Sequence, residues 1–303
     1  MAGNSDFSKD SKTVNCETVN SQEGVGRIMK SGKHGKQIRA ASATAGVVAA
    51  ALCLGGTLPA GAETESVQNH SMGDSIRAEQ GKAPKTFSAI DKRAARLADT
   101  VRGVDVASHQ GTVDWAAQWN AGKRFTWVKA TEGTGYTNPY FGQQYNGSYD
   151  KGFIRGAYHF AHPDSTSGAE QANYFLAHGG GWTGDGKTLP GALDMESVQG
   201  KPACYGLSKS AMGAWIKDFS DTYKAKTNKY PAIYTSANWW SQCVDGDFAK
   251  SNPLWVARYA ADPGQLPGTW GGYSVWQYND SPIDQNVFNG SMDQLTKFAT
   301  AAD

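Results

Sequence analysis

The chain has 303 residues, and its 29 basic and 28 acidic side chains give a formal net charge of +1. This balance argues against a protein that binds nucleic acid through a basic surface. All ten tryptophans lie beyond Arg102, and a packed core needs large apolar side chains. We therefore expect one folded domain over residues 100–303, since about 200 residues suit a single domain.

Residues 1–62 are predicted to be a secretory signal peptide with a long basic region. Basic side chains recur from Arg27 to Arg39, an apolar run follows from Ala43 to Leu54, and small residues lead to a cleavage site after Ala62. The apolar run is too short for the alternative of a membrane anchor, which needs about 20 residues. We therefore expect a secreted, extracellular protein without a membrane anchor.

Residues 63–99 are polar and of mixed charge, and we interpret them as a propeptide or flexible linker. One amphipathic run within them extends from Ser88 to Ala98.

From residue 103 onward, short strands alternate with amphipathic helices. The predicted strands are 103–107, 125–130, 154–160, 191–196, 231–235, 254–259, 274–278 and 283–288, and the predicted helices are 113–121, 140–150, 167–178, 208–226 and 291–301. This alternation predicts an α/β fold, with a parallel sheet and helices outside it. Eight strands in so short a domain indicate a single irregular TIM-like β/α barrel, with incomplete helices around the last strands.

Two cysteines, Cys204 and Cys243, remain after the signal peptide is removed. Extracellular conditions permit oxidation, so a disulfide between them is the favoured interpretation, and two buried thiols are the alternative. Two cysteines alone make no zinc site.

Four acidic residues lie at predicted strand ends, where a parallel barrel carries its chemistry. Asp194 and Glu196 are two residues apart on one strand, so both carboxylates point to the same side. Two close like charges raise the proton affinity of one of them, as a glycosidase requires of its proton donor. Asp105 and Asp284 lie on the first and last strands, which barrel closure makes neighbours.

Aromatic side chains on the predicted strands are candidates for stacking against sugar rings, whose C–H faces are apolar. The candidates are Tyr158, Tyr234, Trp276 and Tyr278. Ordinary core packing is the alternative, and it accounts better for most of the tryptophans. Arg258 would either hold a substrate carboxylate or cap the rim of the barrel.

Three histidines, His109, His159 and His162, raise the question of a metal site. They have no ligand spacing with a third partner, so we interpret them as structural and expect no metal.

The chain from about Gly103 to Phe298 resembles glycoside hydrolase family 25, the Chalaropsis-type lysozymes, and in particular secreted members from actinobacteria. The matching segments are Gly103–Val106, Gln110–Gly111, Val128–Gly133, Arg155–Phe160, Leu193–Glu196, Ile233–Thr235, Leu254–Ala257, Trp276–Tyr278 and Asp284–Gly290.

The resemblance implies hydrolysis of the bond between N-acetylmuramic acid and N-acetylglucosamine in peptidoglycan. It implies that Glu196 is the general acid and that Asp194 either orients the acetamide group of the substrate or stabilises the oxocarbenium-like centre. It makes Asp105 and Asp284 further acids of the cleft, and it supports the disulfide. It implies no cofactor and no partner other than the glycan, and we expect a monomer.

One departure from the family pattern is Ala107, where many relatives have serine. Two other functions would leave different patterns in the sequence. A chitinase would carry a longer run of spaced aspartates before Glu196, and a non-catalytic cell-wall-binding protein should lack Asp194 or Glu196. This sequence has no such run of aspartates, and it keeps both Asp194 and Glu196.

Overall fold

The computed structural model describes residues 69–81 and 100–302. All of these residues belong to one of the two units into which the chain divides, residues 62–303. The predicted signal peptide and the run from Ser88 to Ala98 lie outside the described residues. No helix in the described part of the chain is long and apolar enough to cross a membrane.

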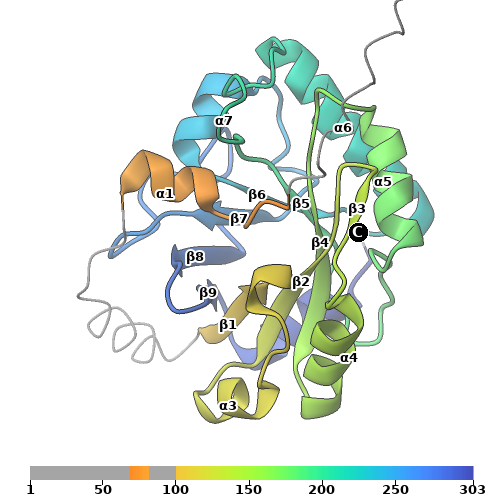
Figure 1. Cartoon of the computed structure of the whole chain (residues 1–303), viewed down its shortest axis with the longest axis vertical. Helices are drawn as coiled ribbons and strands as arrows, with labels where there is room; N and C mark the ends of the chain where they lie inside the picture. Colours follow the sequence, from red (N-terminus) through yellow and green to blue (C-terminus); the bar gives the residue numbers. More distant parts are fainter. Residues whose placement is uncertain (1–68, 82–99, 303) are drawn as a thin grey trace, which may run out of the picture. The chain divides into compact units, whose positions relative to one another are not determined.

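Eight strands form a closed barrel, because the first strand pairs with both the second and the last (Figure 1). Around the ring they are β1 (Val101–Val106), β2 (Phe125–Glu132), β4 (Ile154–Phe160), β5 (Ala192–Asp194), β6 (Ala232–Thr235), β7 (Leu254–Ala257), β8 (Val275–Asn279) and β9 (Asp284–Phe288). A two-residue strand, β3 (Tyr136–Thr137), pairs with the end of β2 and was not predicted. The predicted β/α barrel is confirmed.

One strand departs from the expected parallel arrangement. β9 runs antiparallel to both of its neighbours, β8 and β1. Only residues 280–283 separate β8 from β9, and a parallel return would need a dozen residues or more. The chain therefore turns back as a hairpin, which brings Asp284, the first residue of β9, to the barrel end where the parallel strands finish.

Helices cover most of the barrel. They are η1 (Ser108–Gln110), α3 (Trp115–Asn120), α4 (Phe141–Lys151), α5 (Gly168–Ala177), α6 (Lys209–Thr227), α7 (Ala237–Cys243) and α8 (Met292–Thr300). Ser167 and Ser208 cap α5 and α6 by accepting a hydrogen bond from a backbone N–H three residues on. In the described residues no helix joins β7 to β8, as expected for this side of the barrel.

Alternate side chains of each strand point into and out of the barrel. The outward side chains pack under the helices, for example Ile233 and Val256 with Phe219 of α6. The inward side chains fill one half of the barrel with aromatic rings, including Trp127, which stacks on Trp255 with ring centroids 4.6 Å apart. This apolar layer closes one end, so polar inward residues are confined to the other end.

A segment that precedes the barrel in sequence lies at that polar end. Within residues 69–81, which we call the covering segment, α1 (Asp74–Gln80) forms a short helix drawn in orange in Figure 1. Met72 and Ile76 are fully buried in the same cluster as Trp255. No helix was predicted here, since residues 63–99 were interpreted as a propeptide or flexible linker.

The predicted disulfide between Cys204 and Cys243 is present. It joins the loop after β5 to the last residue of α7, across 39 positions of sequence. Replacing both cysteines with serine should lower the free energy of unfolding by about 2–4 kcal/mol, because the unfolded chain gains conformational freedom. Urea unfolding followed by circular dichroism measures this change, and an unchanged midpoint would contradict it.

Candidate active site

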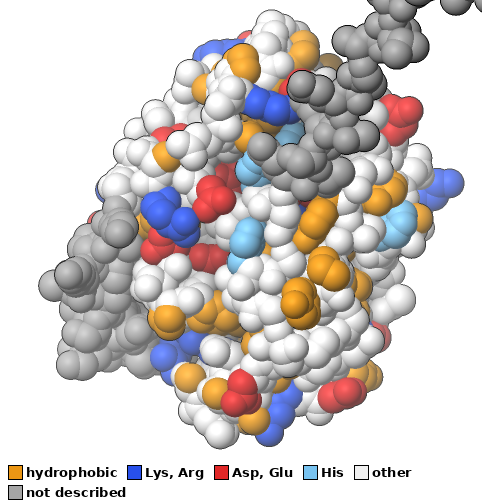
Figure 2. All heavy atoms as spheres, in the orientation of Figure 1, with side chains coloured by type: hydrophobic (Ala, Val, Ile, Leu, Met, Phe, Trp, Pro, Cys, Tyr) orange, Lys and Arg blue, Asp and Glu red, His pale blue; other side chains and the backbone are white. Residues whose placement is uncertain are grey.

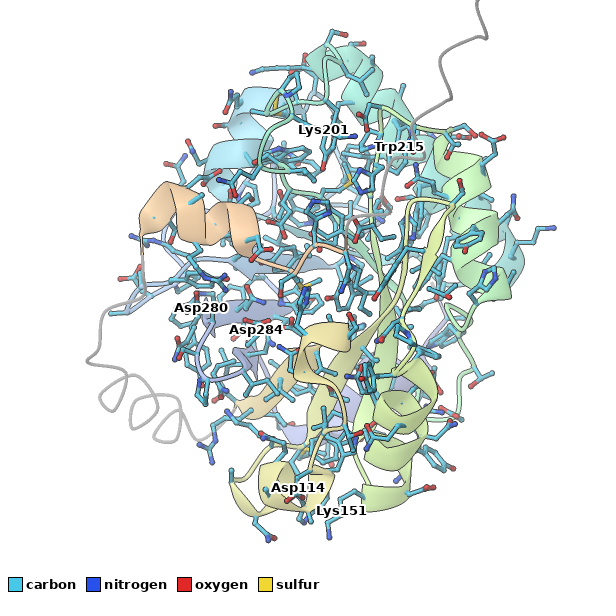
Figure 3. The ribbon with its side chains drawn as sticks, viewed as in Figure 1. Asp114, Lys151, Lys201, Trp215, Asp280 and Asp284 are labelled. Carbon is cyan, nitrogen blue, oxygen red and sulfur yellow. A yellow bond between two sulfur atoms is a disulfide. The ribbon has the colours of Figure 1, made fainter. Side chains whose placement is uncertain are left out.

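The four predicted acids come together at the polar end of the barrel. Asp105 and Asp284 are directly paired in the register between β1 and β9. Asp194 is the last residue of β5, and Glu196 follows two residues later. None of the four is more than 4% exposed. Figure 3 labels Asp284 near the middle of the molecule, with Asp280 of the same hairpin closer to α1.

Asp105 and Asp284 form a buried pair that favours the protonated state. Oδ2 of Asp105 accepts hydrogen bonds from Nδ2 of Asn286 at 2.6 Å and from Nε2 of Gln277 at 2.9 Å. Burial raises the pKa of Asp105 to about 6, although these bonds act in the opposite direction. Burial and the charge of Asp105 also raise the pKa of Asp284. Gln277 and Asn286 were not predicted as site residues.

Asp194 and Glu196 form a second coupled pair. Burial, and then the charge of Glu196, raise the pKa of Asp194 well above its ordinary value, while the charge of Lys129 opposes this rise. Burial raises the pKa of Glu196 to about 7. Neither carboxylate oxygen of Asp194 has a hydrogen-bond partner among the described residues. Two such carboxyl groups hold a proton near neutral pH more readily than isolated ones.

The backbone that carries Glu196 is held in place by the loop after it. The hydroxyl of Tyr205 donates a hydrogen bond of 2.7 Å to the carbonyl oxygen of Glu196. Tyr205 follows Cys204 directly, so the disulfide anchors the same loop. The loop therefore fixes the position of Glu196 beyond the end of β5.

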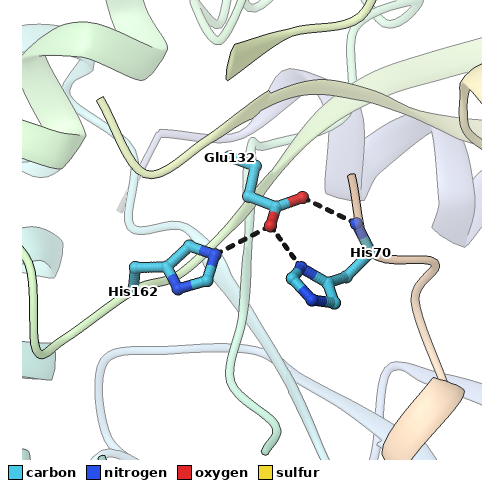
Figure 4. A group of neighbouring side chains, drawn as sticks. All are labelled: His70, Glu132 and His162. Carbon is cyan, nitrogen blue, oxygen red and sulfur yellow. Dashed lines mark hydrogen bonds and ion pairs between the residues drawn. The ribbon is translucent and has the colours of Figure 1, made fainter. Parts of the chain in front are cut away.

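A network centred on Glu132 was not predicted (Figure 4). Its carboxylate contacts Nδ1 of His70 at 2.5 Å, Nε2 of His162 at 2.7 Å and Nζ of Lys129 at 2.5 Å. Burial alone would raise the pKa of Glu132, but hydrogen bonds from His162 and His70 and the charge of Lys129 outweigh it and hold this pKa well below its usual range. The sequence offered one signal, a charged pair three residues apart on a buried strand.

The two histidines and Glu132 also lie close enough to share a metal ion. Nζ of Lys129 already balances the charge of the carboxylate, and the backbone N–H of His70 donates a further hydrogen bond of 2.9 Å to it. The residues present therefore fit an ion-pair network better than a metal centre.

The predicted aromatic residues separate into two groups. Tyr158 and Tyr234 point into the barrel, where the hydroxyl of Tyr234 donates to Oε1 of Gln277 at 2.7 Å. Trp276 and Tyr278 instead lie on the outward face of β8, in the cluster packed under the helices. Predicting these two as sugar-binding residues was wrong, because the alternation of β8 turns Gln277 inward in their place.

The remaining predicted residues have local partners. Arg258 forms an ion pair of 2.6 Å with Asp262 in the loop after β7. His159 is fully buried and contacts Oγ1 of Thr131 at 2.7 Å and Oε1 of Gln171 at 2.9 Å. These contacts give His159 a structural role, as predicted.

A family model described as "Glycosyl hydrolases family 25" matches residues 104–287. The chain belongs to glycosyl hydrolase family 25. It is therefore a glycoside hydrolase, and the resemblance noted from its motifs is confirmed. The matched residues include all four acids of the site.

Several similar proteins are named as muramidases or lysozymes. The N,O-diacetylmuramidase of Chalaropsis sp. is 53% identical over 210 residues, which are 66% of this chain and 100% of that protein. Lysozyme M1 of Streptomyces globisporus is 42% identical, over 75% of this chain and 80% of that protein. The structure of a family GH25 lysozyme from Aspergillus fumigatus superposes with a TM-score of 0.65 at 43% identity, covering 67% of this chain and 100% of that one.

Proposed function

We propose that this protein is a secreted lysozyme that hydrolyses the β-1,4 bond between N-acetylmuramic acid and N-acetylglucosamine in peptidoglycan. The observation that carries the proposal is a family 25 barrel whose polar end gathers Asp105, Asp194, Glu196 and Asp284. The names of the similar proteins support this substrate and this bond.

In the proposed mechanism Glu196 is the general acid. Its pKa of about 7 keeps a proton available at neutral pH for the leaving-group oxygen. Asp194 accepts a hydrogen bond from the N–H of the substrate acetamide. The acetamide oxygen then attacks the anomeric carbon. The free oxygens of Asp194 and the charge of Lys129 beside it favour this role. Water later opens the cyclic intermediate and returns a proton to Glu196, so the configuration is retained.

The product of the reaction tests this proposal. Purified bacterial peptidoglycan is digested, the new reducing ends are converted to alditols, and the sugars are identified after hydrolysis. Muramic acid at the new ends is the expected result. New ends of N-acetylglucosamine would refute the bond assignment, and binding to the walls without any new ends would favour a wall-binding protein.

The rate should fall on the alkaline side of neutrality. Glu196 must be protonated to act, and burial raises its pKa above the ordinary value, so kcat/KM should fall about tenfold for each pH unit above that pKa. Initial rates on a soluble glycan fragment between pH 4 and 9 measure the profile. A rate that stays constant up to pH 9 would contradict the role given to Glu196.

A further inference from the structure

The covering segment contacts the proposed general acid directly. The backbone N–H of Gly73 donates a hydrogen bond of 2.6 Å to Oε1 of Glu196, and the backbone N–H of Ser75 donates one of 2.9 Å to Oε2. Both oxygens of the carboxylate therefore have partners from a segment more than 120 positions earlier in the sequence. A leaving-group oxygen would have to take the place of one of these N–H groups.

The same segment is attached around the rim of the barrel. Nζ of Lys129, on β2, donates a hydrogen bond of 2.5 Å to the carbonyl oxygen of His70. Arg77 pairs with Asp280, between β8 and β9. The backbone N–H of Tyr259, after β7, donates to Oε1 of Gln80 at 2.9 Å. The covering segment therefore spans the ends of several strands.

Two contacts show how closely the covering segment fits against the barrel. The ring of His70 stacks on Phe160 with centroids 5.4 Å apart, which is the kind of contact that a sugar face makes with an aromatic ring. Gly73 approaches the barrel so closely that an added Cβ would lie 2.0 Å from the hydroxyl oxygen of Tyr259. Its φ of 83° also favours glycine.

With the covering segment in place, the four acids have almost no contact with solvent. Their exposed fractions are 4% or less. The cavity of about 860 Å³ beside α1 is lined by the covering segment, Phe160 and residues 197–200, with none of the four acids in its wall. Figure 2 shows acidic, basic and histidine side chains gathered near the middle of this face. A glycan chain needs an open cleft to place its bond beside Glu196.

We propose that the covering segment, residues 69–81, is an inhibitory segment that occupies the glycan-binding cleft and keeps the hydrolase inactive until the segment leaves. The inference rests on the proposed function, because it takes Glu196 as the reacting acid. The segment and the barrel belong to one chain, so the segment binds intramolecularly and at a high effective concentration. Modest contacts then suffice to keep the cleft filled.

Displacing the covering segment by a single substitution tests the proposal in the full chain. Ile76 is fully buried, so Ile76→Asp would place a charge in an apolar cluster and drive the segment off the barrel. The rate on a soluble fragment of uncrosslinked peptidoglycan should rise at least tenfold. Ala78→Asp is the matched control, because Ala78 lies two residues further on the same helix and is exposed; its rate should not change.

A second variant guards against a folding defect in the first. Gly73→Val cannot adopt the same backbone conformation and would clash with Tyr259, so it should activate the chain to a similar extent. Circular dichroism should show both variants folded, because every strand of the barrel lies between Val101 and Phe288.

A chemical readout independent of catalysis accompanies the rates. A water-soluble carbodiimide with an amine labels accessible carboxyl groups, and mass spectrometry locates the label. Glu196 should be protected in the parent and labelled in Ile76→Asp and Gly73→Val. Equal labelling of Glu196 in the parent and both variants would overturn the proposal.

A chain of residues 100–303 separates the two proposals. If it hydrolyses the fragment at least ten times faster than the full chain, the inhibition is supported. If both forms are equally active, the inhibition is wrong and the proposed function stands. If neither form is active but Glu196 becomes labelled in the two variants, the segment still covers the site and the proposed function fails.

Discussion

Glu196→Gln is expected to lower kcat/KM on peptidoglycan by about 10²- to 10⁴-fold, which is the range for loss of general acid catalysis. Glutamine keeps the shape of the side chain and removes the proton that the leaving-group oxygen needs. The variant and the parent must both be compared without residues 1–99, because both oxygens of the Glu196 carboxylate accept hydrogen bonds from the covering segment and glutamine would break one of them. Release of new reducing ends from purified cell walls measures the change.

The matched control is Glu170→Gln. Glu170 lies at the third position of α5, where glutamine completes the same capping arrangement with Ser167. Its rate should equal that of the parent, and both variants should unfold at nearly the parent's temperature. A Glu196→Gln variant that keeps a tenth or more of the activity would remove Glu196 from the proposed mechanism.

Asp194→Asn should separate activity from stability. The proposed role of Asp194 needs a negative charge next to the reacting carbon, so its loss should lower kcat/KM by about 10²- to 10³-fold. The charge is costly for the folded protein, because burial and the charge of Glu196 both raise the pKa of Asp194. At pH 8 the variant should therefore be more stable by about 1 kcal/mol.

Thermal unfolding at pH 8, recorded beside the rate, measures this pair of effects. The gain in stability should shrink at pH 4, where the Asp194 carboxyl of the parent is already protonated and neutral. Parallel losses of activity and stability would instead indicate that asparagine disturbs the packing, and the catalytic role would then lack support.

Much of the barrel could be predicted because its strands are short apolar runs, separated by helices with capping residues. Each predicted strand corresponds to one in the structure. The direction of β9 was missed although the sequence carried the signal, because the residues between the last two strands are too few for a parallel return. The helix α7 was missed because its seven residues are too few for a periodic pattern.

The acids could be predicted because charged residues rarely lie at the end of a buried apolar strand unless they are paired or functional. Their surroundings could not be predicted. The network of Lys129 and Glu132 is completed by His70 and His162, which contact the Glu132 carboxylate from other parts of the chain. Trp276 and Tyr278 were misplaced because the sequence does not say which face of β8 points inward. The covering segment was missed because its helix is short and depends on tertiary contacts made by Met72 and Ile76.

The barrel closes where its first strand meets its last, and Asp105 faces Asp284 across that seam. A ribosome completes β1 before every other strand of the barrel and β9 after all of them. A nascent or truncated polypeptide therefore has an open sheet and lacks one of its carboxylates. The cell that makes this enzyme holds a complete set of acids only once synthesis of the barrel is finished, whatever the state of the covering segment.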